Sequence, residues 1–239
     1  MLAAGYGSRM FPLTSQLAKP LLPVAGRPIV SHVLDKFSNT QGIDEVIVLT
    51  NNKFYTSFQE WISTENGHLP FKVNLLNNGT QDEQQKLGMC GDISYVIETL
   101  KIDDDLIVVG GENLFGADLS EFVQRAHEGK FLVGTYDLKI NEAAGFYNTL
   151  ETDETGRITF FDEKAFRPKN PMIALSLYSY PKSIVKYFKR YLLEGNNPDQ
   201  PGRVIQWLYK RHPIYAHQLK GPWLDVTTID QYFIAQRMF

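Results

Sequence analysis

Short apolar runs alternate with segments of helical periodicity through the first half of the chain. The runs at Glu45–Thr50, Leu106–Val109 and 131–135 have the length and composition of strands. Apolar residues share one helical face in each of three intervening segments: Val30, Val33, Leu34 and Phe37; Phe54, Phe58, Trp61 and Ile62; and Ile93, Val96, Ile97 and Leu100. This alternation predicts a three-layer αβα fold with a mixed, mainly parallel sheet that helices cover on both faces.

The second half of the chain has a different pattern. Residues 149–151 and 158–161 flank a turn sequence and predict a β-hairpin, and Met172–Tyr180 predicts a further strand. We therefore expect a small β-containing lobe within about 136–182. Helices are predicted at 183–193 and 204–211 and from residue 228 onward, with a strand at 214–218.

Composition narrows the classes of partner and compartment. The net charge is −3, so no broad basic face for nucleic acid is expected. The single cysteine, Cys90, excludes an internal disulfide and is expected to lie in the core. No apolar run approaches the length of a membrane span, and we expect a cytoplasmic protein. The opening residues predict a very short first strand, unless the native chain starts upstream of Met1.

The most informative segment is a glycine-rich loop near the start of the chain. Gly5 and Gly7 let main-chain N–H groups turn towards an anion, and Arg9 adds a cation. The third glycine of a dinucleotide fingerprint is missing, because Met10 stands there. Lys19 follows on a proline-stiffened segment and supplies a second candidate cation. The two segments together predict a local phosphate site.

These segments resemble the signature of the sugar-1-phosphate nucleotidyltransferases. Residues 2–14 match its L-A-[AG]-G-x-G-[ST]-R-[LM]-x-P-L-T part, and 19–24 match its K-P-[LM]-[LV]-P-[VI] part. The resemblance continues in order through 109–115, 161–164 and 221–228, and so covers almost the whole chain.

The resemblance implies which residues bind the nucleoside triphosphate. The loop would cradle the triphosphate, and a later segment, 77–93, would recognise the base. That segment is similar to the family branch that reads N-D-G-T followed by L-G-A-I-G-D-I. The expected nucleotide-binding residues are Leu2, Ala3, Ala4, Gly5, Gly7, Ser8, Thr80 and Gly88.

The resemblance also implies the catalytic and metal-binding residues. In this family a phosphate oxygen of the sugar phosphate attacks the α-phosphorus in line, so the protein acts by positioning and by neutralising charge. Arg9 would hold the departing pyrophosphate, Lys19 would lie between the reacting phosphates, and Lys164 would bind the sugar phosphate. Glu112 and Asp225 would bind Mg²⁺, the one cofactor that the resemblance implies.

The acceptor site is where the sequence departs most from the family. The acceptor residues implied by the resemblance are Asn148, Glu163, Lys164 and Tyr178. Four positions differ from the family pattern: Glu112 replaces an aspartate, Asn148 a glycine, Leu175-Ser176 a Thr-Gly pair, and Thr227 a glycine. Three of these changes enlarge side chains where the family leaves room for substrate, so the acceptor pocket is expected to be remodelled.

We interpret 1–239 as a single nucleotidyltransferase domain, with a nucleotide-binding part at about 1–135 and an acceptor-binding part at about 136–239. The leading hypothesis is Mg²⁺-dependent transfer from a nucleoside triphosphate to a sugar 1-phosphate. One alternative is cytidylyl transfer to a small acceptor such as phosphocholine. A second is a non-catalytic relative that binds a nucleotide or sugar nucleotide for regulation. The sequence does not specify which nucleobase or which phosphorylated acceptor the protein uses, or its oligomeric state.

Overall fold

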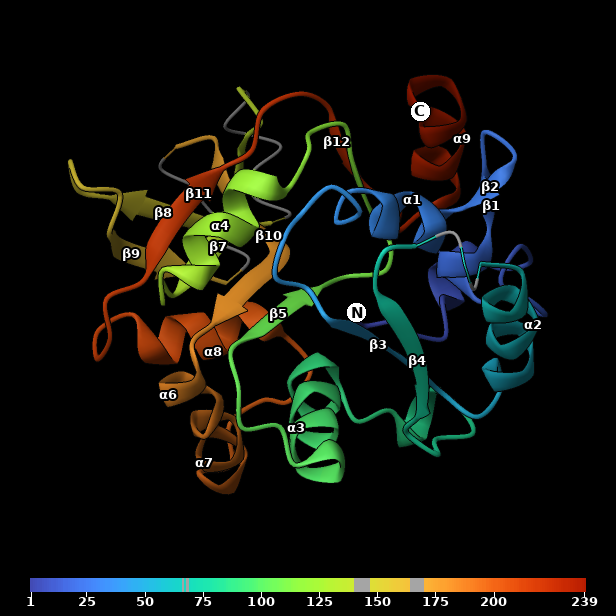
Figure 1. The fold of residues 1–239 in the computed structure, drawn as a ribbon, viewed down its shortest axis with the longest axis horizontal. Helices are drawn as coiled ribbons and strands as arrows, with labels where there is room; N and C mark the ends of the chain where they lie inside the picture. The colour runs from blue at the N-terminus through green and yellow to red at the C-terminus, as the bar shows by residue number, and fades with distance from the viewer. Residues whose placement is uncertain (66, 68, 140–146, 164–169) are drawn as a thin grey trace. The chain divides into compact units, whose positions relative to one another are not determined.

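A computed structural model describes residues 1–65, 67, 69–139, 147–163 and 170–239. The described residues form two compact units that interleave along the sequence (Figure 1). The first unit comprises Met1–Lys86, Val109–Val123 and Gly221–Phe239, and the second comprises Leu87–Val108 and Gln124–Lys220. Each unit therefore draws on segments that are distant in sequence.

The centre of the first unit is a parallel pair of strands, β3 (Glu45–Thr50) and β4 (Lys72–Asn77). The carboxyl half of β3 is buried, which suits its β-branched and apolar residues. Leu2 adds to this pair through parallel bridges to Leu49 and Gly110. In these residues the first strand is reduced to the single bridged residue Leu2.

The last helix of the first unit begins at a capping box. The Thr228 side chain accepts a hydrogen bond from the Gln231 main-chain N–H. In return, the Gln231 side chain accepts a hydrogen bond from the Thr228 main-chain N–H. From there α9 (Ile229–Met238) packs against β1 (Pro23–Val24), which pairs antiparallel with β2 (Arg27–Pro28) (Figure 1). The C-terminal segment is thereby joined to the segment that follows Lys19.

Two further helices cover the strands of the first unit. Helix α1 (Ile29–Asp35) packs against β6 (Asn113–Phe115), and α2 (Tyr55–Glu65) packs against β4 with Phe58 and Trp61 buried. The remaining elements of this unit are η1 (Ser8–Met10), η2 (Lys19–Leu21), η3 (Glu83–Gln85) and β12 (Trp223–Asp225).

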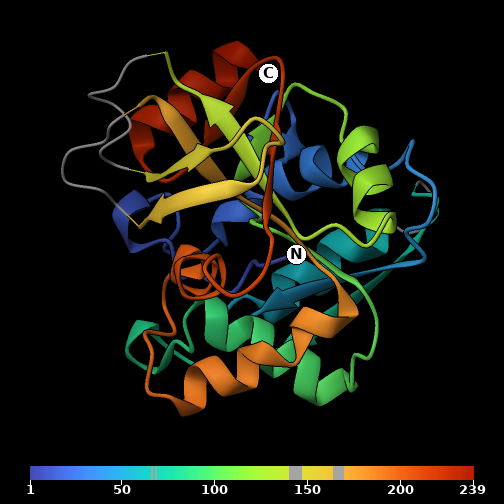
Figure 2. The same ribbon diagram turned by 90° about the vertical axis from the view of Figure 1, so that its left-hand side faces the viewer.

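The second unit is built on a mixed sheet in the order β11-β7-β10-β8-β9, with β5 also paired to β10 (Figure 2). Strand β11 runs parallel to β7, whereas the β7–β10, β10–β8 and β8–β9 pairs are antiparallel. Strand β10 is buried along most of its length because its sequence is almost continuously apolar. The strands are β5 (Leu106–Val109), β7 (Leu132–Asp137), β8 (Asn148–Thr152), β9 (Ile158–Asp162), β10 (Met172–Tyr180) and β11 (Tyr215–Gln218).

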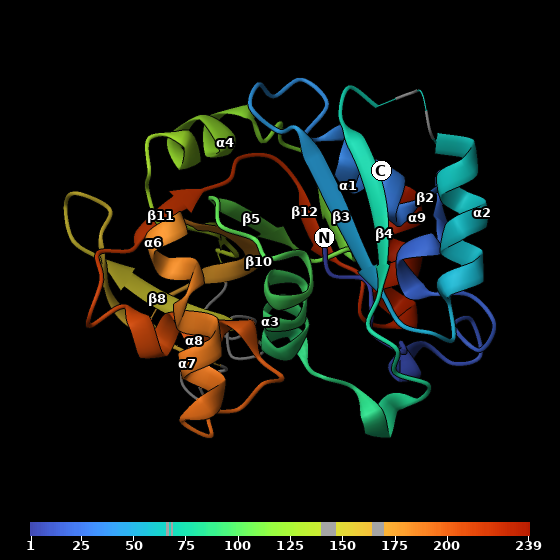
Figure 3. The same cartoon turned by 60° about the horizontal axis from the view of Figure 1, so that its bottom comes forward.

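Helices gather along one side of this sheet (Figure 3). Helix α3 packs against α7 and α8, and α8 also packs against β9. Pro201 stands at the start of α8, where its missing N–H costs nothing. The helices are α3 (Met89–Leu100), α6 (Lys182–Val185), α7 (Tyr187–Leu193) and α8 (Pro201–Leu208), while α4 (Ser120–His127) begins in the first unit and ends in the second.

Most elements expected from the sequence are present. The predicted hairpin is formed by β8 and β9, and the strand predicted at Met172–Tyr180 is β10. The prediction of one helix at 183–193 was wrong in one respect, because the segment is split into α6 and α7 at Lys186. Lys186 keeps helical dihedral angles, so the chain continues in the same sense and periodicity alone could not reveal the break. Within the described residues, no helix is both long and apolar enough to cross a membrane.

Candidate active site

The glycine-rich loop uses its two glycines differently. Gly7 has a left-handed φ of 66° and precedes η1, and a Cβ on it would stand 3.0 Å from the Thr14 side chain. Thr14 also donates a hydrogen bond from Oγ1 to the Gly7 carbonyl at 2.7 Å. A Cβ on Gly5 would meet nothing within 4 Å among the described residues. The loop's own conformation thus accounts for Gly7, whereas Gly5 leaves open space beside the main chain.

The side chains around this loop divide into buried and exposed sets. Leu2, Ala3 and Ala4 are buried, so they offer a ligand only their main chain. Ser8 and Arg9 are exposed, and Ser8 Oγ donates to Glu83 Oε1 at 3.1 Å. The loop therefore presents main-chain groups and one exposed guanidinium, a combination suited to an anion.

Lys19 lies beside a carboxylate of the same unit. It opens η2, and its Nζ stands 3.9 Å from Glu112 Oε1. The two side chains are only 12% and 19% exposed, so water screens this pair less than a surface ion pair. The segment behind Lys19 is held closely, since a Cβ on Gly111 would meet the Leu2 carbonyl at 3.0 Å and Pro20 at 3.3 Å.

A short antiparallel pair, β6 with β12, brings the two predicted metal ligands together. Asp225 stands opposite Asn113 in the register, and the Val226 N–H donates to the Glu112 carbonyl at 3.1 Å. The Trp223 indole N–H donates to Asn113 Oδ1 at 3.0 Å and ties the two strands together through buried side chains. Residues more than 110 positions apart in sequence therefore place two carboxylates side by side.

Asp225 carries a buried oxygen that lacks a protein partner. Its Oδ1 is covered and makes no hydrogen bond with any residue that the structure describes. Burial raises the pKa of the Asp225 carboxyl, and the neighbouring Glu112 raises it further, while Lys19 and Arg9 oppose the shift. A covered, unpaired carboxylate oxygen next to a second carboxylate fits a divalent cation.

The donor set also fits the preference of Mg²⁺. The described residues hold no cluster of three or more metal-ligating side chains, so Glu112 and Asp225 would be the protein's contribution here. Mg²⁺ is commonly held by one or two carboxylates together with water and substrate phosphates.

The residues predicted to recognise the base lie in both units. Thr80 is buried in the first unit, where its hydroxyl accepts a hydrogen bond from the Tyr6 hydroxyl at 2.9 Å. Gly88 belongs to the second unit and has a φ of 77°, and a Cβ on it would approach the Pro198 carbonyl to 2.5 Å. Packing alone therefore requires glycine at position 88.

Three of the four acceptor residues predicted from the sequence lie close together in the second unit. Asn148 begins β8 and Glu163 follows β9, and a Cβ on Gly202 of α8 would overlap both side chains. Tyr178 is buried in β10, where burial raises its pKa and the nearby Glu163 carboxylate raises it further. Lys164 lies outside the described residues. Gly202 was not predicted as a site residue, because nothing in the sequence around α8 marks it.

Comparison with known proteins identifies the family. Residues 1–239 match the family model described as nucleotidyl transferase. The chain belongs to the nucleotidyl transferase family. A bifunctional protein GlmU of Methanocaldococcus jannaschii is 26% identical over 228 residues, which are 95% of this chain and 50% of the relative. A glucose-1-phosphate adenylyltransferase of Mycoplasma mobile is 25% identical in an alignment of length 252 that covers 98% of this chain and 65% of the relative.

The likeness extends to a solved structure. A protein from Bacillus anthracis assigned as a glucose-1-phosphate thymidylyltransferase, crystallised with sucrose, aligns with a TM-score of 0.85 at 20% identity, over 99% of this chain and 92% of that one. The predicted α/β fold with a mixed sheet is thereby confirmed, as is the resemblance to this family. The chain spans between half and about two thirds of the length of the two relatives named above.

One departure from the family pattern has a structural reason. Thr227 Oγ1 donates to Gln231 Oε1 at 2.7 Å, and the Thr227 N–H donates to the same oxygen at 2.9 Å. Thr227 therefore extends the cap of α9 beyond the capping box. A glycine there would lose the side-chain hydrogen bond, so this substitution serves the fold next to Asp225.

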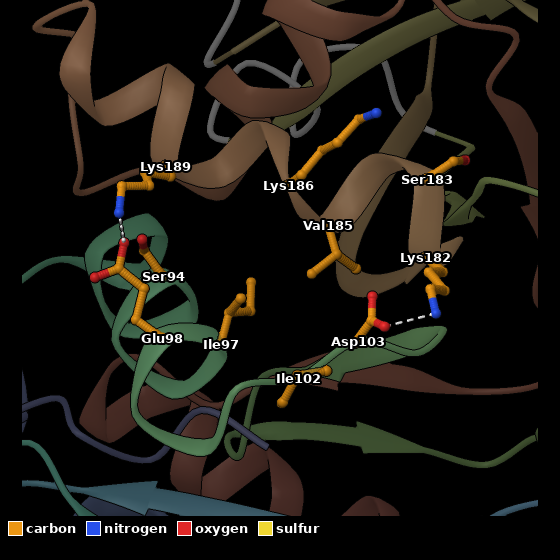
Figure 4. Close-up of a pocket in the computed structure, with 10 residues that line it drawn as sticks. All are labelled: Ser94, Ile97, Glu98, Ile102, Asp103, Lys182, Ser183, Val185, Lys186 and Lys189. Carbon is orange, nitrogen blue, oxygen red and sulfur yellow. Dashed lines mark hydrogen bonds and ion pairs between the residues drawn. The ribbon is translucent and has the colours of Figure 1, made fainter.

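A hollow of about 460 Å³ in the second unit has no link to the family motifs (Figure 4). Two lysines at its edge are paired: Lys182 Nζ lies 2.8 Å from Asp103 Oδ2, and Lys189 Nζ lies 3.6 Å from Glu98 Oε1. Carboxylates thus neutralise two of the three lysines that line the hollow, and none of its lining residues belongs to a family motif.

The single cysteine is also structural. Cys90 is buried at the start of α3, and its Sγ donates to the Gln200 carbonyl at 3.2 Å. Burial raises the pKa of its thiol, and the charge of Glu163 raises it further, so the thiol stays protonated and is no nucleophile.

Proposed function

We propose that this protein transfers a nucleotidyl group from a nucleoside triphosphate to a sugar 1-phosphate in a Mg²⁺-dependent reaction that releases pyrophosphate. The observation that carries the proposal is the cluster of Lys19, Glu112 and Asp225 in the first unit. An unpaired, buried carboxylate oxygen is costly to the fold, and a cation that binds there would remove the cost.

The chain's own residues would divide the work. The open main chain at Gly5 and the Arg9 guanidinium would hold the triphosphate and the departing pyrophosphate. Lys19, oriented by Glu112, would neutralise charge between the reacting phosphates. Bound at Glu112 and Asp225, Mg²⁺ would supply further neutralisation of the phosphate oxygens.

We assign the acceptor to the residues that gather over Gly202. The Asn148 amide and the Glu163 carboxylate offer donors and acceptors for sugar hydroxyls, and Lys164 would bind the sugar phosphate. Phosphocholine would need aromatic rings around its quaternary ammonium group. Tyr178 is 1% exposed, so its own ring does not offer its face to such a group.

Pyrophosphate release tests the proposal directly. The purified chain is mixed with each of ATP, CTP, GTP, UTP and dTTP against glucose 1-phosphate, N-acetylglucosamine 1-phosphate, mannose 1-phosphate and phosphocholine, with and without Mg²⁺. We expect release with a sugar 1-phosphate only, and only with Mg²⁺. Nucleotide binding without release from any pair would instead support the regulatory, non-catalytic relative.

Three further expectations accompany this function. We propose that 1–239 acts as one nucleotidyltransferase domain, with the nucleotide bound mainly by about 1–135 and the acceptor by about 136–239. Nucleoside triphosphate and sugar 1-phosphate are its expected partners, and nucleic acid and membrane are not. A cytoplasmic location stays a prediction from the sequence.

A further inference from the structure

Two hydrogen bonds attach Ala4 and Tyr6, at the start of the phosphate-binding loop, to residues that follow two neighbouring strands. Strands β3 and β4 run parallel with Thr50 opposite Asn77, so their carboxyl ends lie at one edge. From the end of β3, Asn51 Nδ2 donates to the Ala4 carbonyl at 2.9 Å. From the segment after β4, Thr80 accepts the hydroxyl of Tyr6.

Tyr6 is the side chain that the loop sends into the core. It is 6% exposed, and its ring packs against that of Phe54 with centroids 6.4 Å apart. Its hydroxyl donates to Thr80 Oγ1 at 2.9 Å, and Thr80 Oγ1 donates in turn to Asn78 Oδ1 at 2.8 Å. One hydrogen bond therefore connects the phosphate-binding loop to the segment 78–80, and a second one continues within that segment.

Thr80 has already used both of its hydrogen-bond donors inside the protein. Its N–H also donates to Asn78 Oδ1, at 3.0 Å, and its carbonyl accepts the Asn52 N–H at 2.9 Å. With both donors committed, Thr80 cannot donate to a nucleobase. Its part in nucleotide binding is therefore to fix the position of neighbouring residues.

We propose that Tyr6 and Thr80 are positioning residues that lock the phosphate-binding loop to the base-facing segment, so that base selection and triphosphate placement depend on each other. This inference rests on the proposed function, because that function makes 78–80 the base-facing segment. A base that fits poorly would shift 78–80, and the shift would reach Gly5 and Gly7 through the Tyr6 hydroxyl. A misplacement of about 1 Å at reacting groups can cost roughly 10²-fold in rate.

Four variants test this relay. Tyr6→Phe and Thr80→Val each remove one hydroxyl with little change in shape, and the double variant removes both. Thr80→Ser keeps a hydroxyl and is the matched control at that position. Tyr232→Phe is the control for loss of a tyrosine hydroxyl, since Tyr232 Oη donates to the Pro23 carbonyl at 2.8 Å in the same unit.

The readouts are kcat and KM for each nucleotide, KM for the acceptor, and nucleotide affinity by calorimetry with ATP, CTP, GTP, UTP and dTTP. We expect Tyr6→Phe to lower kcat/KM for the preferred nucleotide about tenfold, because the loop loses its buried hydrogen bond to Thr80. The preference over the second-best nucleotide should shrink, while the acceptor KM stays unchanged. The double variant should be no worse than the more affected single variant.

Several results would overturn the relay. Base preference that is unchanged in Tyr6→Phe and Thr80→Val would do so, as would losses that multiply in the double variant. If Tyr6→Phe does not fold, the contrast between Thr80→Val and Thr80→Ser decides. A wild-type protein that binds nucleotide without turnover would reject the proposed function but leave calorimetric base preference as the test of the relay. A wild-type protein that binds no nucleotide would reject both.

Discussion

The two units differ in how their candidate site residues are held. In the first unit the loop, Lys19, Glu112 and Asp225 match the family motifs almost throughout and are fixed by main-chain and buried side-chain contacts. In the second unit the acceptor residues converge on one main-chain position, Gly202, which the motifs do not mark. Under the proposed function, the first arrangement would set the reaction type and the second would select the acceptor.

The largest effect expected is from Asp225→Asn in the first unit. Turnover should fall by roughly 10³, because a metal-binding charge is lost. In metal-free buffer the variant should melt at a temperature equal to or above that of the wild type, since a buried carboxylate beside Glu112 is removed. Mg²⁺ should raise the melting temperature of the wild type only. If turnover of Asp225→Asn stays within about tenfold of the wild-type value, Asp225 is not a metal ligand.

Arg9→Ala should have the next largest effect. Turnover is expected to fall by roughly 10², because Arg9 would stabilise the leaving pyrophosphate. The melting temperature should hardly change, since Arg9 is exposed. The control is Arg27→Ala, which breaks a 2.6 Å surface ion pair with Asp35 at a cost below about 1 kcal/mol and should leave turnover intact. Equal activity of both variants would show that the loop cation is dispensable.

Gly202→Ala should have a smaller effect, on acceptor binding in the second unit. The added methyl would push Glu163 and Asn148 apart, so the acceptor KM should rise about tenfold while the nucleotide KM is unchanged. Stability should fall by about 1–3 kcal/mol from overpacking. Glu163→Asp shortens the crowded side chain and should partly restore stability in the double variant. A rise in nucleotide KM instead would mean that Asn148 and Glu163 do not serve the acceptor alone.

Glu112→Asp should have the smallest effect. The natural side chain pairs with Lys19 at 3.9 Å, and shortening it withdraws the carboxylate from both Lys19 and the cation. Turnover should stay the same or fall by at most about tenfold. Steady-state rates over a Mg²⁺ titration measure the change. A large gain in turnover would instead favour the alternative that the natural protein is a non-catalytic relative.

The sequence predicted the elements and the polar residues better than their contacts. Periodicity located β3, β10 and the β8–β9 hairpin, because each is set by local residue choice. The motifs also named the residues that come together at Lys19, Glu112 and Asp225. Their roles stay predictions, and Lys164 lies outside the described residues.

What the sequence did not predict depends on contacts between distant segments. The hydrogen bond from Tyr6 to Thr80 spans 74 positions, and nothing in the local sequence marks these two residues as partners. Gly111 is one such case, because its N–H donates to the Leu2 carbonyl at 2.9 Å and a Cβ on it would meet Pro20 at 3.3 Å. A glycine in a motif therefore does not reveal whether it makes room for a ligand or for the protein itself.

The hydrogen bond between Trp223 and Asn113 has a spectroscopic consequence. The Trp223 indole belongs to the strand that ends at Asp225, and Asn113, which accepts its hydrogen bond, directly follows Glu112. Trp61 and Trp207 lie instead in helices α2 and α8. In a Trp61→Phe, Trp207→Phe background, Trp223 would be the only tryptophan emitter, and its emission should change on Mg²⁺ or nucleotide addition. The protein thus carries an intrinsic fluorophore next to the two carboxylates, so ligand binding there can be followed without a label or a catalytic assay.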